Sequence, residues 1–466
     1  MAHDLVVIGG GPAGEKAAAA AAYFGKKVAL IDRGVDGPGG AAVHTGTIPS
    51  KTLRETALYI TGFHRRELYG GMSFELDART RSAPELTCRL PSVRDMQTRQ
   101  IRDNLSRHGI EEIRGPARFE GAHCVRVGDR LVEGEYFLIA TGSEPRQPPA
   151  FDFSDPDVFD SDTLLRIDKI PETLAVIGGG VIGCEYACVF AALGVDIDVI
   201  ERGPRVMGFL DHEISDALMA SMRASGIDIH LDDGVDRIER VDGKLVLTLA
   251  SGDREVVDKV LVCAGRTGNT ANLGLNAIGV TLDERKLVVV DADFRSSVPH
   301  VFAAGDVIGR PALASTSMEQ GRVAVSAMFG LSVPARDWSA IPAGIYTIPE
   351  ACACGPTEQE LEQQGVPYVV GRSHMRHNAR GQIIGDTDGF VKLIFHRETQ
   401  KLLATHMICE WATELIHIGQ AVMRLGGGID YFLESVLTYP SLSEAFKFAA
   451  YDALGALSGH RPSPLT

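Results

Sequence analysis

The sequence lacks the features that would place it in a membrane, outside the cell or on a nucleic acid. No run of about 18 apolar residues occurs, and the first residues, MAHDLVVIGGGPAG, lack the cationic and apolar regions of a signal peptide. No basic run interrupts the net charge of −15, whereas phosphate-tracking proteins need a concentrated positive surface. We therefore expect a cytoplasmic protein that binds neither membranes nor nucleic acid.

Paired cysteines are also absent. The eight cysteines form no CxxC motif, so we expect no disulfide framework. Cys184 and Cys188 are four residues apart on a predicted helix, and in principle they could share a metal ion. Because no second pair accompanies them, buried thiols are the favoured interpretation, and we expect no metal site.

What the chain does have is ordinary globular composition and ample length. Its 466 residues include 51 glycines and 22 prolines, and 45% of the residues are hydrophobic. These values exclude collagenous and largely disordered proteins. The length is sufficient for two or three domains.

Two segments of the chain nearly repeat one another. Residues 5–14 read LVVIGGGPAG and residues 174–183 read LAVIGGGVIG, and each is an apolar strand that enters a GxGxxG turn. Each segment continues through a helix-favouring stretch to a second apolar strand that ends in an acid, Asp32 or Glu201. A single GxGxxG match is weak, but the complete βαβ pattern occurring twice predicts two dinucleotide sites; structural βαβ units without nucleotides are the disfavoured alternative.

The predicted role of the glycines is to let the backbone approach a pyrophosphate at a helix N-terminus, where N–H groups favour negative charge. The acid would accept a hydrogen bond from a ribose hydroxyl. The glycines assigned to these two sites are Gly9, Gly11 and Gly14 in the first and Gly178, Gly180 and Gly183 in the second.

Three further apolar strands, at 137–145, 260–270 and 301–307, end in glycine-containing loops. Glycine at a strand end lets a ligand lie against the backbone, although each loop alone is more often a plain turn. The binding candidates in these loops are Gly142, Gly265, Arg266, Gly305 and Asp306. After about residue 340 the pattern changes to antiparallel strands with flanking helices, which is typical of an α+β domain that mediates association.

In chain order, the motifs GGGPAG, ATGS, GGGVIGCE, AGRTGNT, AAGD and IYTIPE resemble the flavin-dependent pyridine nucleotide-disulfide oxidoreductases. GGAAVHTGTIPSK at 39–51 is similar to the active-site segment of that family. The resemblance implies a homodimer of α/β subunits, each with two Rossmann-like dinucleotide-binding domains and a C-terminal α+β dimerisation domain. The implied domains are 1–147 and 271–340 for FAD, 148–270 for NAD(P), and 341–466 for dimerisation.

The same resemblance implies noncovalent FAD in the first βαβ unit and NAD(H) or NADP(H) in the second. Ala117 would contact the adenine through its backbone, Thr141 and Gly142 would flank the cofactor, and Asp306 would hold the ribityl chain. A helix beginning near Ala314 would point its N-terminus at the flavin. Lys51 and Glu185 would form an ion pair near flavin N5; a solvated lysine is the alternative for Lys51.

Two departures from the family pattern concern its redox chemistry. Ala42 and Thr47 occupy the positions of the two redox cysteines, and the C-terminal HPxxxE motif begins with Tyr439 in place of His, although its acid remains as Glu444. Disulfide chemistry requires a thiolate and a group that shuttles protons near neutrality, whereas tyrosine has a pKa of about 10. We therefore do not expect dithiol–disulfide chemistry.

Hydride exchange does not need those groups. Thr47 and the YPxxxE motif resemble the soluble transhydrogenase branch of the family. That branch exchanges hydride between NADPH and NAD by a ping-pong reaction through flavin N5. Ala42 departs from the pattern, because the branch commonly has cysteine at this position. Glu201 suits the 2′-hydroxyl of NAD, and Arg202 and Arg205 would attract the 2′-phosphate of NADP, unless they form an ordinary surface turn.

Two other functions remain open from the sequence. One is an NAD(P)H:quinone or dye reductase, because a cysteine-free branch of the family shares the GGAAV segment. The other is a non-enzymatic dimeric flavoprotein that serves as a scaffold or sensor. Retention of Lys51, Glu185 and a complete second fingerprint argues against this last alternative.

Overall fold

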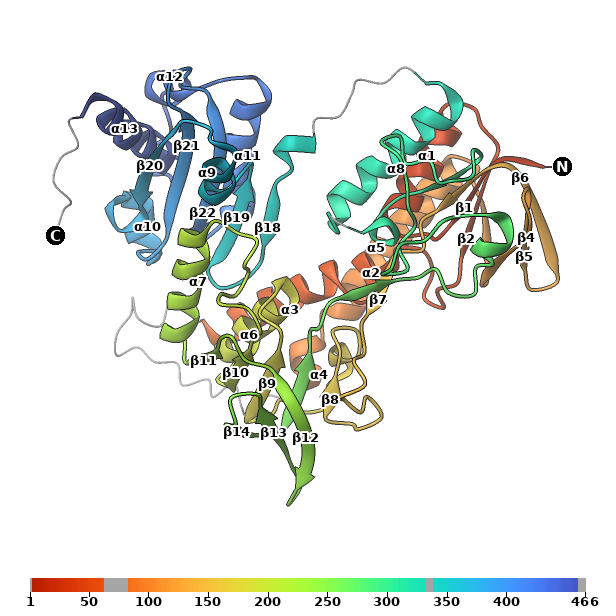
Figure 1. The fold of residues 1–466 in the computed structure, drawn as a ribbon, viewed down its shortest axis with the longest axis horizontal. Coiled ribbons are helices and arrows are strands. Elements are labelled where there is room, and N and C mark those ends of the chain that lie inside the picture. The colour runs from red at the N-terminus through yellow and green to blue at the C-terminus, as the bar shows by residue number, and fades with distance from the viewer. Residues whose placement is uncertain (1, 63–82, 310, 332–337, 460–466) are drawn as a thin grey trace.

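The computed structural model describes residues 2–62, 83–309, 311–331 and 338–459. It is an α/β fold with three principal sheets (Figure 1). The first sheet and the C-terminal sheet lie in two lobes at the top of the view, and the second sheet lies below them. Within the described ranges, no helix is long and apolar enough to cross a membrane.

The first sheet is a parallel sheet extended by an antiparallel hairpin. Its inner strands are apolar along their length because both of their faces are covered, and Leu5, Val6 and Val7 are fully buried. The strand order is β3-β2-β1-β6-β5-β4, and β17 pairs with β6. The strands are β1 (His3–Ile8), β2 (Val28–Asp32), β3 (Glu111–Arg114), β4 (Ala117–Gly121), β5 (Cys124–Val127), β6 (Arg130–Ile139) and β17 (Val301–Ala303).

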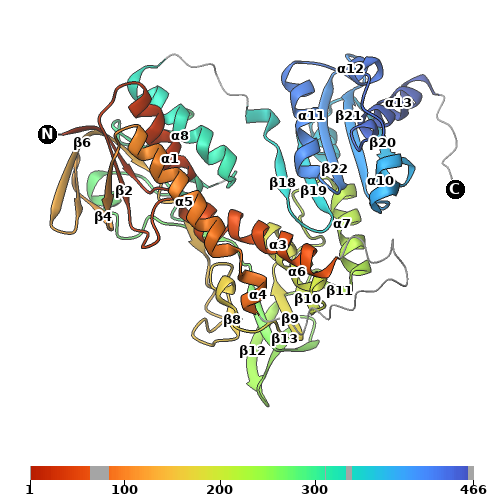
Figure 2. The same cartoon turned by 180° about the vertical axis from the view of Figure 1, so that it is seen from behind.

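Helices α1 (Pro12–Tyr23) and α8 (Ala314–Phe329) pack together on one face of this sheet (Figure 2). A Cβ atom at Gly321 would lie 2.3 Å from the carbonyl oxygen of Ala13, so glycine is required for the two helices to come this close. Helix α5 (Leu90–Arg107) also contacts α1. This packing fixes the N-terminus of α1, where the first glycine turn lies.

The second sheet is parallel, with the order β11-β10-β9-β15-β8. Its strands are β8 (Val158–Phe159), β9 (Thr173–Ile177), β10 (Asp196–Ile200), β11 (Ile227–His230) and β15 (Lys259–Val262). Helices α6 (Val181–Ala192) and α7 (His212–Ala224) follow β9 and β10, and a separate sheet contains β12 (Val235–Val241), β13 (Lys244–Leu249) and β14 (Arg254–Val257). An antiparallel ribbon of β7 (Ser143–Pro145) and β16 (Arg266–Gly268) contains both crossings between the first and second sheets.

The third sheet is antiparallel, with the order β18-β19-β22-β21-β20. Its strands are β18 (Ala343–Ile345), β19 (Glu350–Cys354), β20 (Tyr368–His374), β21 (Phe390–His396) and β22 (Leu402–Cys409). The accompanying helices are α9 (Glu358–Gln364), α10 (Ala379–Ile384), α11 (Ala412–Arg424), α12 (Ile429–Glu434) and α13 (Glu444–Ser458). The predicted change to an antiparallel α+β arrangement after residue 340 is confirmed.

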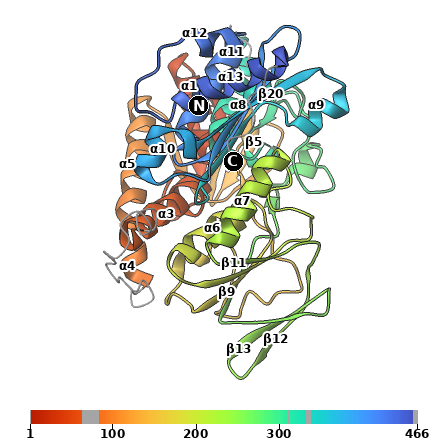
Figure 3. The ribbon, with the colours of Figure 1, turned by 90° about the vertical axis from the view of Figure 1, so that its left-hand side faces the viewer.

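A buried lysine joins this third sheet to α7, which lies between the second and third sheets (Figure 3). Lys392 on β21 is fully buried, donates to Asp211 at 2.6 Å, and lies 3.0 Å from Glu213 and against Glu358. Burial raises the pKa of Asp211, but the hydrogen bonds from Lys392 and the Glu358 N–H, together with the charge of Lys392, outweigh that effect, and the net pKa is lowered. Because a buried charge is tolerated only when paired, this cluster fixes the third sheet on the second βαβ unit.

Candidate active site

The two glycine turns leave open space above the N-termini of α1 and α6. Gly11 and Gly180 are the N-cap residues of these helices, and neither helix has a side-chain cap. A Cβ atom at Gly11 would meet only the Cα atom of Gly40, at 3.7 Å, and one at Gly180 would meet nothing within 4 Å. Uncapped backbone N–H groups that face open space fit a pyrophosphate, so both turns have the form a dinucleotide requires.

The other predicted glycines are needed for close packing of the backbone. Gly9 has φ +110° and Gly178 has φ +112°, and added Cβ atoms would lie 2.2 Å and 2.6 Å from carbonyl oxygens at neighbouring strand ends. At Gly14 and Gly183 the Cβ atom would lie 1.9 Å from the carbonyl oxygen of the first glycine of the same turn. The middle glycine is therefore the one whose missing side chain leaves space for a ligand.

The acid that ends each βαβ strand also holds its own glycine turn. Glu201 accepts from the N–H groups of Gly179 at 2.6 Å and Gly203 at 2.7 Å. Asp32 forms the equivalent two bonds in the first unit, at 2.5 Å and 2.6 Å. The sequence pattern predicted only a ribose contact. A carboxylate has about four lone-pair sites, so the two acids retain capacity for a ribose hydroxyl.

The two arginines that follow Glu201 have different surroundings. Arg205 forms an ion pair with Asp216 on α7, a contact that sequence reasoning did not foresee. Arg202 is exposed, and within the described part of the chain it has no ion-pair partner. Arg202 is therefore the better candidate of the two to bind the 2′-phosphate of NADP.

Lys51 and Glu185 are 134 residues apart in sequence, and the structure brings them together. Lys51 Nζ donates to the two carboxylate oxygens of Glu185 at 2.8 Å and 2.7 Å, where α3 (Thr47–Thr61) packs against α6. The side chains are 23% and 7% exposed, so the ion pair is largely shielded from water. Tyr346 also contacts both members of the pair; it lies within the quoted IYTIPE motif but was not singled out.

A second group of predicted residues lies at and beside the β7–β16 ribbon. Asp306 accepts from the hydroxyl of Ser143 at 2.8 Å, and this hydroxyl accepts from Arg266 Nε at 2.8 Å.

Thr141 donates to the carbonyl of Asn269 at 2.8 Å, and the Asn269 amide donates back to the Thr141 carbonyl at 3.0 Å. Three predicted glycines adopt positive φ angles in the adjacent loops, namely Gly142, Gly265 and Gly305. Ser143 and Asn269 lie within the motifs quoted above but were not singled out.

The other predicted residues lie in three further places. Ala314 is the first residue of α8, as predicted, and this helix has no side-chain cap. Ala117 begins β4 and is buried. Tyr439 is 73% exposed, and Glu444 begins α13, which lies on the outer side of the third sheet and away from α3 (Figure 1). The single chain therefore does not place Tyr439 and Glu444 beside Lys51.

No cysteine occupies either redox position. Ala42 lies in α2 (Gly40–His44), and Thr47 begins α3. Cys184 and Cys188 are buried on α6, and burial raises the pKa of Cys188 to about 11. The Cys184 thiol donates to the carbonyl of Gly179 at 3.3 Å. These surroundings favour neutral packed thiols over metal ligands.

Modifying the accessible thiols of the native protein should therefore leave its activity largely intact. Cys88 is exposed and Cys124 is half-buried, whereas burial raises the pKa of Cys263, which lies beside the second glycine turn, to about 12. The thiolate is the reactive form, so Cys263 should react slowly. Thiol titration of native and denatured protein, with activity measured in parallel, provides the check. Complete loss of activity after one thiol is labelled would reveal a catalytic cysteine.

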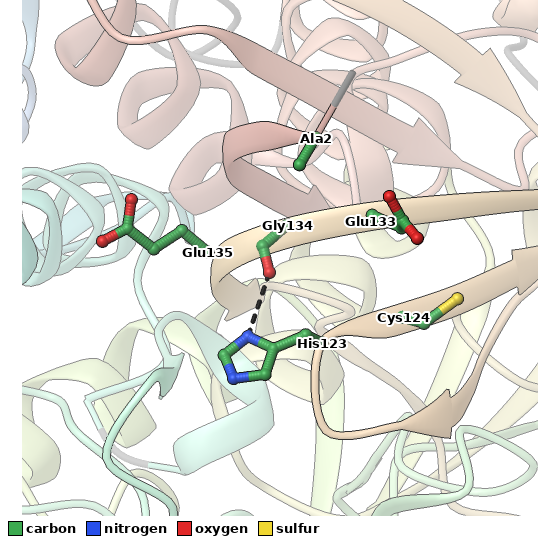
Figure 4. A pocket seen from close by; sticks show the side chains of 6 residues that line it. All are labelled: Ala2, His123, Cys124, Glu133, Gly134 and Glu135. Carbon is green, nitrogen blue, oxygen red and sulfur yellow. Dashed lines mark hydrogen bonds between the residues drawn. The ribbon is translucent and has the colours of Figure 1, made fainter.

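A shallow pocket of about 360 Å³ lies elsewhere, at the β5–β6 end of the first sheet (Figure 4). The residues that line it are Ala2, His123, Cys124, Glu133, Gly134 and Glu135. His123 Nδ1 lies 3.1 Å from the carbonyl oxygen of Gly134 and donates to it. None of the predicted site residues lines this pocket, so it is separate from both glycine turns.

Two glycine-turn βαβ units in one chain, with a shielded Lys–Glu pair beside the second, define a class of oxidoreductases that use two dinucleotides. The chain belongs to the pyridine nucleotide-disulphide oxidoreductase family: that family's profile matches residues 3–321, and the profile of its dimerisation domain matches residues 341–450. The predicted family and fold class are thus confirmed.

Relatives of known name cover nearly the whole chain. Proteins named soluble pyridine nucleotide transhydrogenase from Mycobacterium tuberculosis and Enterobacter are 42% and 40% identical, each covering 98% of both chains. Among solved structures, the HOCl-induced flavoprotein disulfide reductase RclA from Escherichia coli has a TM-score of 0.87 at 28% identity, covering 96% of this chain and 99% of its own. LpdA from Mycobacterium tuberculosis also has a TM-score of 0.87, at 27% identity over 96% of this chain and 99% of its own.

Proposed function

We propose that the protein is an FAD-dependent transhydrogenase that exchanges hydride between NADPH/NADP and NAD/NADH without disulfide chemistry. The observation that carries this proposal is the combination of two open glycine turns and the Lys51–Glu185 pair with Ala42 and Thr47 at the redox positions. The names of relatives that are 40–42% identical support the same reaction. The cytoplasm is the proposed location.

We assign noncovalent FAD to the domain formed by residues 1–147 and 271–340, and NAD(H) and NADP(H) to residues 148–270. When bound, FAD would supply the acceptor and donor of hydride between the two nucleotides. Gly11 and Gly180 would admit the pyrophosphates to the uncapped N-termini of α1 and α6. Asp32 and Glu201 would accept hydrogen bonds from the ribose hydroxyls.

Lys51 would present a fixed positive charge, held by both oxygens of Glu185 in a partly dehydrated site. A charge fixed before the reaction costs no reorganisation when negative charge develops nearby. The uncapped N-terminus of α8, at Ala314, would act in the same direction. A hydride carries both of its electrons, so its transfer requires neither a thiolate nor an imidazole.

We further propose a homodimer that pairs through residues 341–466. Helix α13 exposes Phe448, Tyr451 and Leu454, and the preceding segment exposes Val436 and Tyr439. Clustered exposed apolar side chains are typical of interaction surfaces. In such a dimer, Tyr439 and Glu444 would act at the active site of the partner subunit.

The decisive experiment is anaerobic reduction of the holoenzyme with NADPH, followed by a chase with NAD. We expect the flavin to bleach and then to recover its colour as NADH appears. Bleaching that is reversed by menadione but not by NAD would favour the quinone reductase alternative. Failure of both NADH and NADPH to bleach the protein would favour a non-enzymatic flavoprotein.

Nucleotide preference provides a further prediction at the end of β10. Replacing Arg202 by Ala should raise the KM for NADPH roughly 10- to 100-fold, because a charge-assisted hydrogen bond contributes about 1.5 to 3 kcal/mol. The KM for NADH should change little, since NADH lacks the 2′-phosphate. Arg205→Ala is the matched control and should have a smaller effect, because Asp216 already pairs with Arg205. Steady-state kinetics with both nucleotides would show whether Arg202 discriminates between them; equal losses would contradict the assignment.

A further inference from the structure

We propose that Tyr346, supplied by the C-terminal sheet, is a positioning residue that fixes the Lys51–Glu185 pair. This inference rests on the proposed function, because it concerns the pair assigned to the hydride-transfer site. Tyr346 follows β18 directly and lies in the segment that precedes β19. The residue therefore belongs to a different sheet from the helices that carry Lys51 and Glu185.

Tyr346 contacts both members of the ion pair, Glu185 through its backbone N–H and Lys51 through its aromatic ring. The backbone N–H of Tyr346 donates to Glu185 Oε1 at 2.9 Å, and this oxygen also accepts from Lys51 at 2.8 Å. The Lys51 ammonium lies 4.7 Å from the centroid of the Tyr346 ring. The electron-rich face of an aromatic ring attracts a cation, most strongly where water is partly excluded. The tyrosine thus constrains both charges at once.

Thr413 lies beside the phenol end of Tyr346. Burial raises the pKa of Tyr346, and the side chain of Thr413, at the start of α11, opposes that shift. The hydroxyl and backbone N–H of Thr413 donate to Glu350 Oε2 at 2.8 Å and 3.0 Å. The neighbour of the phenol is therefore itself fixed to a buried carboxylate.

The chain of contacts returns to the helix that carries Lys51. Glu350 Oε1 lies 3.5 Å from the guanidinium of Arg54, one helical turn after Lys51 on α3. Arg54 Nε also donates to the carbonyl of Thr347 at 3.2 Å. Arg54 and Glu350 are both buried, and removing one partner of a buried pair is costly. These contacts therefore hold α3 against the segment that contains Tyr346.

The test compares Tyr346→Leu with Tyr346→Phe in the holoenzyme. Leucine removes the aromatic ring, whereas phenylalanine keeps the ring and lacks only the hydroxyl group. At saturating NADPH, the Leu variant should reduce its flavin roughly 3- to 30-fold more slowly in stopped-flow measurements, because cation–π attraction contributes about 0.5 to 2 kcal/mol. The Phe variant should stay within about twofold of wild type, and both should retain full FAD content.

Two further measurements separate positioning from a general loss of structure. In a Lys51→Met background, the Leu replacement should have no additional effect on the rate of flavin reduction. The midpoint potential of the bound flavin should shift in Tyr346→Leu but not in Tyr346→Phe. Equal rates of flavin reduction and equal midpoint potentials in the Leu and Phe variants would overturn the inference. So would a Leu variant that slows flavin reduction as much in the Lys51→Met background as in wild type. If the Leu protein does not fold, Tyr346→Met decides by the same comparison.

These measurements use only reduction by NADPH, so they are independent of the second half of the proposed exchange. If reduced enzyme fails to pass hydride to NAD while the Leu and Phe variants differ as expected, the proposed function is wrong and the positioning role stands. If exchange proceeds and the variants do not differ, the positioning role is wrong and the proposed function stands.

Discussion

Replacing Gly11 by valine should give a folded protein that binds no FAD. An added Cβ atom at this position would contact only the Cα atom of Gly40, at 3.7 Å, so the polypeptide accommodates it. The remaining methyl groups would extend into the space above the α1 N-terminus that we assign to the pyrophosphate. Visible absorbance and FAD released per chain measure the loss, and circular dichroism reports whether the fold survives.

The control for this experiment lies in the same turn. Gly14→Val should prevent folding itself, because its Cβ atom would lie 1.9 Å from the carbonyl oxygen of Gly9. The two variants therefore distinguish a ligand-excluding side chain from a fold-breaking one. Normal FAD content in Gly11→Val would show that the first turn is not the FAD pyrophosphate site.

Replacing Gly180 by valine should have the complementary effect, a yellow protein that neither NADH nor NADPH can bleach. The space beside Gly180 contains no atom within 4 Å of an added Cβ, so the protein should fold and keep its FAD. The valine methyl groups would occupy the corresponding phosphate space at the N-terminus of α6, so nucleotide affinity should fall steeply. Anaerobic titration with each nucleotide, followed at the flavin absorbance, measures the effect.

Dithionite provides the control for Gly180→Val, since it reduces flavin without needing a nucleotide site. We expect dithionite to bleach this variant as it bleaches wild type. Gly183→Val should not fold, in parallel with Gly14→Val, because its Cβ atom would lie 1.9 Å from the Gly178 carbonyl oxygen. Bleaching of Gly180→Val by NADH at the normal rate would exclude the second turn as the nucleotide site.

The sequence predicted the parts of the fold that follow from local pattern. Apolar strands running into GxGxxG turns predicted both βαβ units, and the changed pattern after residue 340 predicted the antiparallel sheet. The Lys51–Glu185 pair came from family resemblance rather than from spacing, because the two residues are on different helices and 134 positions apart. Its geometry in the structure agrees with that expectation, whereas its role in hydride transfer stays a prediction.

Residues that act through tertiary contact had no local signature. Asp216 is one acid among several exposed residues of α7, and nothing in the sequence indicated that it would pair with Arg205. Tyr346 stands within IYTIPE, which marked the family but gave no reason to expect an aromatic ring over Lys51. The same holds for Ser143, whose hydroxyl connects Arg266 to Asp306 only because two chain crossings form one ribbon.

Glu201 both holds its own glycine turn and is the predicted ribose ligand, which limits how the coenzyme preference can be redesigned. Exchanging this acid for a neutral or basic residue is an obvious route towards an NADPH-selective enzyme. Here the same carboxylate holds the N–H groups of Gly179 and Gly203, so its removal would release the turn that we assign to the nucleotide pyrophosphate. Such a change would weaken the binding of both NADH and NADPH. Engineering should therefore keep Glu201 and vary the neighbouring surface, beginning with Asp216, whose neutralisation would free Arg205 for a phosphate.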